Sequence, residues 1–138
     1  MKPAAVLTDL DGTLLEHGGG LGADARAAIV RLRELGVPVV PLTSKTETEL
    51  RALLAELDSG GIGSFENGAG IVTPAGAVVS QKAVPADRPS DRLDELARSA
   101  GVPLTPAAAL PVAEIRRITG LPEEKVPAML ARGYGLPF

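Results

Sequence analysis

Two carboxylates separated by one residue stand near the start of the chain, in the sequence Asp-Leu-Asp-Gly-Thr at residues 9–13. Asp9 can attack phosphorus and carry the phosphoryl group as an aspartyl-phosphate, which splits one difficult transfer into two easier steps. Asp11 can then protonate the leaving oxygen and later deprotonate the hydrolytic water. Gly12 lets the backbone turn tightly beneath a phosphoryl group. The spacing favours phosphoryl transfer, with Asp9 as nucleophile and Asp11 as general acid and base.

A divalent cation is expected at this pair, because two carboxylates facing a phosphate would otherwise repel it. Mg²⁺ is the natural candidate, since it prefers oxygen ligands and binds phosphate, and Asp9 and Asp11 are its candidate ligands. The Asp-x-Asp-Gly pattern also occurs in calcium loops and in plain turns. A calcium loop would need further oxygen ligands at alternating positions, and Leu14 and Leu15 do not supply them.

The segments around this motif predict a parallel α/β sheet. Residues 4–8 are apolar and too few for a helix, so they predict a buried strand with Asp9 at its carboxyl end, where ligands bind in open sheets. Residues 37–42 and 62–65 predict two further strands. Pro38 and Pro41 each remove a ladder donor and argue against full pairing of the second strand.

Helical patterns separate these strands. One periodic apolar segment ends at Gly36, and a second helix begins with a capping box formed by Thr46 and Glu49. Its apolar residues recur at helical spacing: Leu50, Leu53, Leu54 and Leu57. The alternation of strands and helices predicts right-handed crossovers, and residues 71–79 predict a β-hairpin.

Composition narrows the class of protein further. The 138 residues suit one domain, and 14 basic side chains are interspersed with 17 acidic ones, so no basic stripe suggests a nucleic-acid partner. The chain has no cysteine, which removes disulfides, thiolate metal sites and cysteine nucleophiles. The apolar run at the N-terminus is too short for a signal peptide or a membrane span. We therefore expect a cytoplasmic protein with a small-molecule partner and no membrane partner.

Residues 9–13 after an apolar strand resemble the first motif of the haloacid dehalogenase (HAD) superfamily of phosphatases. The second motif of that superfamily is a Thr or Ser at the end of the next strand, which Thr43 matches. A hydroxyl there can bind a phosphoryl oxygen near a helix N-terminus. Within the superfamily, the chain resembles the mannosyl-3-phosphoglycerate phosphatase family. This likeness is carried by residues 43–46, 66–71, 118–124 and 131–138.

The resemblance implies a fold and a substrate. The fold is a HAD-like Rossmannoid three-layer α/β core with a parallel sheet over residues 1–83, with a β-hairpin, followed by the start of an inserted α/β cap over residues 84–138. The implied activity is Mg²⁺-dependent hydrolysis of a phosphosugar, mannosyl-3-phosphoglycerate above all.

The resemblance also implies binding residues. Asn67 and Gly68 would help to line the phosphosugar site, and Ser44 and Lys45 would flank the phosphate. Taken alone, Asn67 and Gly68 form a turn signal. Lys45 lies near a helix start, where its charge opposes the helix dipole, and this placement favours an anionic partner.

Adjacent arginines at Arg116 and Arg117 have two interpretations. Such pairs usually mark a solvated helix face. Contact with a phosphoglycerate carboxylate from the cap is the alternative.

Two further HAD motifs have no counterpart in the sequence. These are a lysine that balances the charge of nucleophile and phosphate, and paired acidic residues that complete the Mg²⁺ site. The later aspartates Asp87, Asp91 and Asp94 do not form such a pair after a strand. A truncated piece of a longer enzyme is the explanation we favour, and a naturally short homologue or a half completed by another chain are the others. The exposed edge of the first strand is compatible with a homo-oligomer. A catalytically deficient binding or assembly module is the alternative function.

Overall fold

The structure is a computed structural model and describes residues 2–16, 20–86 and 89–138. Its strands are β1 (Val6–Thr8), β2 (Val39–Pro41), β3 (Gly63–Phe65), β4 (Gly70–Thr73) and β5 (Gly76–Val79). Its α-helices are α1 (Ala23–Glu34), α2 (Glu47–Leu57), α3 (Pro89–Ala100), α4 (Val112–Thr119) and α5 (Val126–Leu130). Short 3₁₀ helices lie at η1 (Glu66–Gly68), η2 (Ala107–Ala109) and η3 (Glu123–Lys125).

The strands form a parallel pair joined to an antiparallel group of three. β1 pairs with β2 in parallel, with Thr8 opposite Pro41, and β3, β4 and β5 pair in that order as antiparallel neighbours. An isolated parallel bridge between Leu42 and Ser64 connects the two groups. Together they are a mixed sheet in which β1, β2 and β3 run in the same direction, as the sequence predicts.

Pro41 explains why β2 and β3 are joined so sparsely. The amide of Leu42 donates to Thr8 in the β1 strand, whereas the amide of Thr43 donates to Ser64 in β3. Successive backbone groups alternate in direction along a strand, so the nitrogen of Pro41 faces β3 and has no hydrogen to donate. The predicted cost of this proline is therefore confirmed on one side of β2, while the pairing with β1 is kept.

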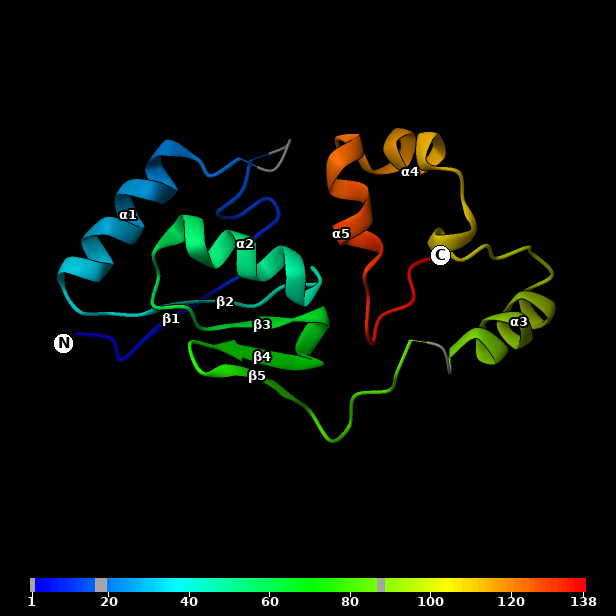
Figure 1. Ribbon diagram of the computed structural model, residues 1–138, viewed down its shortest axis with the longest axis horizontal. Coiled ribbons are helices and arrows are strands. Elements are labelled where there is room, and N and C mark those ends of the chain that lie inside the picture. Colours follow the sequence, from blue (N-terminus) through cyan, green and yellow to red (C-terminus); the bar gives the residue numbers. More distant parts are fainter. Residues whose placement is uncertain (1, 17–19, 87–88) are drawn as a thin grey trace.

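One face of the mixed sheet carries the core. Val39, Phe65 and Val72 are buried there against Ile29 of α1 and the leucines of α2. On the opposite face, Leu7, Ile71 and Val78 are 63%, 48% and 65% exposed. Figure 1 shows α1 and α2 together on the same side of the strands. The described residues thus form two layers of the predicted three-layer arrangement.

The start of α2 is fixed by the predicted capping box, which the structure confirms. The hydroxyl of Thr46 accepts a hydrogen bond from the amide of Glu49 at 3.2 Å, and the carboxylate of Glu49 accepts one from the amide of Thr46 at 2.9 Å. Thr46 is fully buried. Because both residues are held at the helix start, the segment of residues 43–45 that precedes the helix is anchored at the carboxyl end of β2.

The chain returns to the core at its end. The predicted hairpin is confirmed as β4 and β5. After α3 and α4, the helix α5 packs beside α2 (Figure 1). There the Thr46 hydroxyl donates to the carbonyl of Ala128 at 2.9 Å. The helical stretch that begins at Glu123 is divided into η3 and α5. Pro127 lies in the first turn of α5, where an amide hydrogen has no helical partner.

Among the described residues, no helix has the length and apolar character that a membrane crossing requires.

Gly70 is a site where one added methyl group should destabilise the fold. A Cβ atom there would lie 2.4 Å from the Phe65 ring and 2.9 Å from the carbonyl oxygen of Val78. Phe65 is 1% exposed and cannot move aside, so we expect Gly70→Ala to lower the free energy of unfolding by about 3 kcal/mol. Urea denaturation measures this change. Gly20→Ala, where a Cβ meets nothing within 4 Å, is the control, and equal stability of the two variants would contradict the packing shown.

Candidate active site

A tight loop presents the two aspartates at the carboxyl end of β1. Leu10 is fully buried, and its carbonyl oxygen accepts hydrogen bonds from the amides of Thr13, Leu14 and Leu15 at 3.1, 3.1 and 2.8 Å. Gly12 has φ 78°, a conformation that favours glycine. With Leu10 as the anchor, the flanking residues Asp9 and Asp11 are both exposed. Two exposed carboxylates therefore follow the carboxyl end of β1.

Lys45 lies against this loop. Its ammonium Nζ is 2.8 Å from Oδ1 of Asp11, with side-chain exposures of 20% for Lys45 and 54% for Asp11. An ion pair this accessible is screened by water and adds at most about 1 kcal/mol to stability. Its importance is geometric, because it brings a cation from the segment after β2 to the motif after β1.

Thr43 occupies the end of β2 next to Lys45. It is buried, its amide donates to the carbonyl of Ser64 at 3.0 Å, and its hydroxyl oxygen accepts from the amide of Lys45 at 3.1 Å. Among the described residues, this hydroxyl has no acceptor for its own hydrogen. Ser44, between these two residues, is exposed.

Asn67 and Gly68 lie in the turn η1 after β3 and are exposed. The amide of Asn67 donates to the carbonyl of Thr43 at 2.9 Å, which places η1 beside the segment of residues 43–45. Of the residues singled out in the sequence, backbone and side-chain contacts thus bring together Asp11, Thr43, Lys45 and Asn67. Asp9 lies at the same end of the sheet, because the preceding Thr8 is paired with Pro41.

The donor atoms near residues 9–11 agree in kind with Mg²⁺. Asp9 offers a carboxylate and Asp11 a carboxylate and a backbone carbonyl, all of them the hard oxygen ligands that Mg²⁺ prefers. Across the described ranges, however, no group of three or more His, Cys, Asp or Glu residues could hold a metal ion. Asp94 is exposed on α3, whereas Asp87 lies outside the described residues. The residues therefore fit part of a Mg²⁺ site.

A cavity of about 320 Å³ opens beside Lys45, between the core and the end of the chain. Residues from three places line it, among them Leu15, Lys45, Glu49, Leu53, Leu121 and Lys125. Lys45 is shared by the cavity and the ion pair with Asp11. Through Lys45, this cavity adjoins the loop that carries Asp11.

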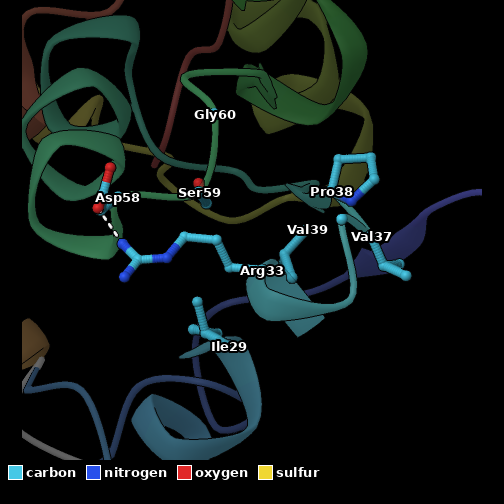
Figure 2. A pocket seen from close by; sticks show the side chains of 9 residues that line it. Ile29, Arg33, Val37, Pro38, Val39, Asp58, Ser59 and Gly60 are labelled. Atoms are coloured by element: carbon cyan, nitrogen blue, oxygen red, sulfur yellow. Dashed lines mark hydrogen bonds and ion pairs between the residues drawn. The ribbon is translucent and has the colours of Figure 1, made fainter. Parts of the chain in front are cut away.

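A second cavity, of about 360 Å³, lies at the other end of the sheet (Figure 2). Figure 2 shows the Arg33 side chain extending to Asp58, with which it pairs, and Val37 and Val39 lie beside Arg33 around the start of β2. Ligands of open α/β sheets bind at the carboxyl ends of the parallel strands. This second cavity faces the amino end of β2 and has no part in the candidate site.

The two adjacent arginines of α4 form ion pairs with nearby acidic residues. Arg116 pairs with Glu123 at 3.0 Å, and Arg117 pairs with Glu114 at 2.6 Å. The hydrogen bond from Arg117 lowers the pKa of Glu114, and the same bond raises the pKa of Arg117. All four side chains are substantially exposed, which favours the solvated helix face over the carboxylate contact.

Glu66 and Arg132, to which the sequence assigns no individual role, each hold the segment of residues 43–45 by a hydrogen bond to one of its carbonyl groups. The amide of Glu66 donates to the carbonyl of Lys45 at 2.9 Å, and Arg132 donates to the carbonyl of Ser44 at 2.8 Å. No local pattern predicts these contacts, because each residue is distant in sequence from its partner; Arg132 is 88 residues from Ser44.

The comparison with known proteins agrees with this geometry. The family of haloacid dehalogenase-like hydrolases matches residues 6–102, well over half of the chain, and the chain belongs to this family. The matched residues include both aspartates, Thr43, Lys45 and η1.

Individual relatives are phosphatases. The chain is 39% identical to a glucosyl-3-phosphoglycerate/mannosyl-3-phosphoglycerate phosphatase of Persephonella marina over 51% of the chain and 26% of that protein. It is 32% identical to the mannosyl-3-phosphoglycerate phosphatase of Aeropyrum pernix over 94% of the chain and 51% of that protein. A solved phosphatase of the HAD superfamily from Bacteroides thetaiotaomicron superposes with a TM-score of 0.56 at 25% identity, covering 86% of the chain and 47% of that structure. The chain thus spans about half, or less, of the relatives it matches.

Proposed function

We propose that the protein acts in the Mg²⁺-dependent hydrolysis of a phosphosugar, mannosyl-3-phosphoglycerate, through an aspartyl-phosphate. The observation that carries the proposal is the meeting of Lys45 with Asp11 at 2.8 Å, beside Thr43, where β1 and β2 end in a chain of the HAD hydrolase family. The names of the relatives from Persephonella marina and Aeropyrum pernix support this substrate.

Asp9 acts as the nucleophile in the proposed reaction. A carboxylate oxygen of Asp9 bonds to phosphorus while the bond from phosphorus to the leaving oxygen breaks, and Asp11 gives its proton to that oxygen. In the second half, Asp11 takes a proton from water as the water oxygen attacks phosphorus. The bond from phosphorus to Asp9 then breaks, which releases phosphate and restores both carboxyl groups.

The surrounding residues bind and orient the phosphate. The Thr43 hydroxyl donates to a phosphoryl oxygen, and Lys45 turns from Asp11 toward the added negative charge, with Ser44 at the flank. Asp9 and Asp11 would hold the Mg²⁺, which supplies electrostatic stabilisation of the phosphoryl oxygens when bound. Lys45 thereby keeps a cation at the site before the substrate arrives.

The remainder of the substrate is assigned to the cavity beside Lys45 and to the turn with Asn67 and Gly68. We propose residues 1–83 as core and residues 84–138 as part of a cap, so that this cavity lies where the two meet. In a complete core of this kind, a third layer would cover the exposed sheet face that carries Leu7, Ile71 and Val78. The homo-oligomer expected from the edge of β1 stays a prediction.

A second candidate function is a binding or assembly module without turnover. It is favoured by one observation, that no group of three or more potential metal-binding side chains forms among the residues described. Such a module would keep the phosphate contacts of Thr43 and Lys45 and lack the reaction. Phosphate binding without phosphate release would identify it.

Turnover with Mg²⁺ tests the proposal. We expect a polypeptide that contains residues 1–138 to release inorganic phosphate from mannosyl-3-phosphoglycerate, with glucosyl-3-phosphoglycerate and simple hexose phosphates as comparisons, and to lose this activity on chelation of Mg²⁺. Phosphate release is measured for the 138-residue chain alone and for a longer polypeptide in which this chain is extended to the full length of its relatives. Phosphate release by neither, under conditions in which a relative is active, would reject the proposal.

A further inference from the structure

Glu66 is a buried carboxylate that the proposed reaction does not use. It is 7% exposed and stands where β3 ends and η1 begins. Its φ is 44° and that of Asn67 is 57°, so two successive residues other than glycine adopt the left-handed conformation. Such backbone persists only where the surroundings determine it, and the contacts of Glu66 supply that determination.

Three successive amides surround this carboxylate. The amide of Gly133 donates to Oε1 at 2.9 Å, and the amides of Tyr134 and Gly135 donate to Oε2 at 2.9 and 2.5 Å. Consecutive N–H groups that converge on one anion form a nest, and their charge-assisted bonds are stronger than neutral ones. The negative charge of Glu66 is therefore satisfied by a segment 67–69 residues away in sequence.

The backbone of the same turn holds the segment that carries the phosphate-binding candidates. Amides of Glu66 and Asn67 donate to the carbonyls of Lys45 and Thr43, each at 2.9 Å. Arg132, next to the amide nest, donates to the carbonyl of Ser44 at 2.8 Å. The segment of residues 43–45 is thus tied to residues 132–135 both through Glu66 and directly through Arg132.

Aromatic packing accompanies this connection. The rings of Phe65 and Tyr134, which adjoin Glu66 and the nest in sequence, lie with centroids 6.4 Å apart and tilted by 45°. Phe65 is a buried member of the core, and Tyr134 packs against that core. The nest is therefore held at the edge of the core, and the Glu66 residue that it binds is buried, which strengthens hydrogen bonds to its charge.

We propose that Glu66 is a positioning residue, whose carboxylate couples the docking of residues 133–135 to the conformation of the segment of residues 43–45. Loss of the charge frees residues 133–135, and the turn at Glu66 and Asn67 then holds Lys45 and Thr43 less firmly. In the proposed phosphatase, on which this kinetic consequence rests, Lys45 meets the phosphate less precisely. Docking of residues 133–135 thus affects the candidate site although Glu66 does not touch the substrate.

Hydrogen exchange, residue by residue, tests the coupling without reference to activity. Glu66→Gln keeps the size of the side chain and removes its charge. We expect the amides of residues 133–135 and of Lys45 to exchange about tenfold or more faster, in line with the loss of charge-assisted hydrogen bonds. Unchanged exchange rates at both places in a folded variant would overturn the proposal. Faster exchange at residues 133–135 with an unchanged rate at Lys45 would also overturn it.

Two glycines of the nest provide a matched pair for the case in which Glu66→Gln fails to fold. A Cβ at Gly135 would lie 3.2 Å from Glu66 Oε2 and 3.2 Å from Nη1 of Arg132, whereas a Cβ at Gly133 would lie 3.9 Å from Oε1, an ordinary contact. We expect Gly135→Ala to speed exchange at Lys45 and Gly133→Ala to leave it unchanged. Equal effects of the two variants at Lys45 would contradict the coupling.

Kinetics separate this proposal from the proposed function. If phosphate is released, Glu66→Gln and Gly135→Ala should raise the KM for the phosphosugar several-fold, with a smaller change in kcat. An unchanged KM despite faster exchange at Lys45 would refute the effect on substrate positioning. If no polypeptide releases phosphate, the proposed function fails, whereas the exchange measurements still decide the coupling.

Discussion

Asp9→Asn is expected to lower kcat for phosphosugar hydrolysis by roughly a thousandfold or more, because an amide cannot attack phosphorus as a carboxylate does. The side chain is exposed, so the change should leave stability within about 0.5 kcal/mol of the unaltered protein. The measurement is steady-state release of phosphate with Mg²⁺, in the shortest polypeptide containing residues 1–138 that is active.

Asp94→Asn is the control for this variant, since Asp94 is an exposed aspartate on α3 and lies outside the candidate site. It removes the same charge and should retain activity. Acid-quenched protein analysed by mass spectrometry should carry a phosphoryl group on Asp9 in the unaltered chain and none at this position in Asp9→Asn. Substantial activity of Asp9→Asn would exclude the aspartyl-phosphate pathway.

The parts of the fold that the sequence predicts depend on neighbours in the chain. The leucines of α2 and the capping box of Thr46 and Glu49 lie within a few residues of one another, so periodicity and spacing are enough to find them. The same is true of Asp9 and Asp11, whose place at the carboxyl end of β1 follows from the apolar run directly before them.

The contacts that the sequence does not reveal connect distant segments. Glu66 precedes an Asn-Gly turn signal and would be taken for a solvated acidic residue, yet its partners are the amides of residues 133–135. Backbone amides have no side-chain signature, so no residue type in that segment indicates an anion-binding nest. Pairing of Lys45 with Asp11 is also absent from local patterns, because it depends on β1 and β2 being neighbours.

The sparse pairing of β2 with β3 could be predicted from the sequence only in part. Proline at position 41 predicts a lost donor, and the structure shows which side loses it, because the amide of Leu42 faces β1 and that of Thr43 faces β3. The direction of alternation cannot be read from the run of residues 37–42 alone, since both faces of the strand are apolar. Topology therefore decides what a locally visible residue does.

Asp11→Asn should lower kcat for a phosphosugar by about a hundredfold to ten-thousandfold, the usual contribution of a general acid or base. Asn cannot protonate the departing alkoxide oxygen of the substrate, which is a poor leaving group without a proton. The phenolate of an aryl phosphate leaves without protonation, so the first half-reaction with such a substrate should be almost unaffected. With this substrate we expect a burst of phenolate equal to the enzyme concentration, followed by slow turnover, because Asn also cannot take the proton from water.

The ion pair offers a competing explanation, since Asp11→Asn also removes the partner of Lys45. Lys45→Met separates the two effects: it breaks the same ion pair, keeps the acid, and should raise the KM for both substrates because the phosphate loses a cation. If Asp11 served only to hold Lys45, the two variants would behave alike and neither would show a burst. A burst confined to Asp11→Asn would require proton transfer by this carboxyl group, and its absence would remove Asp11 from the catalytic role.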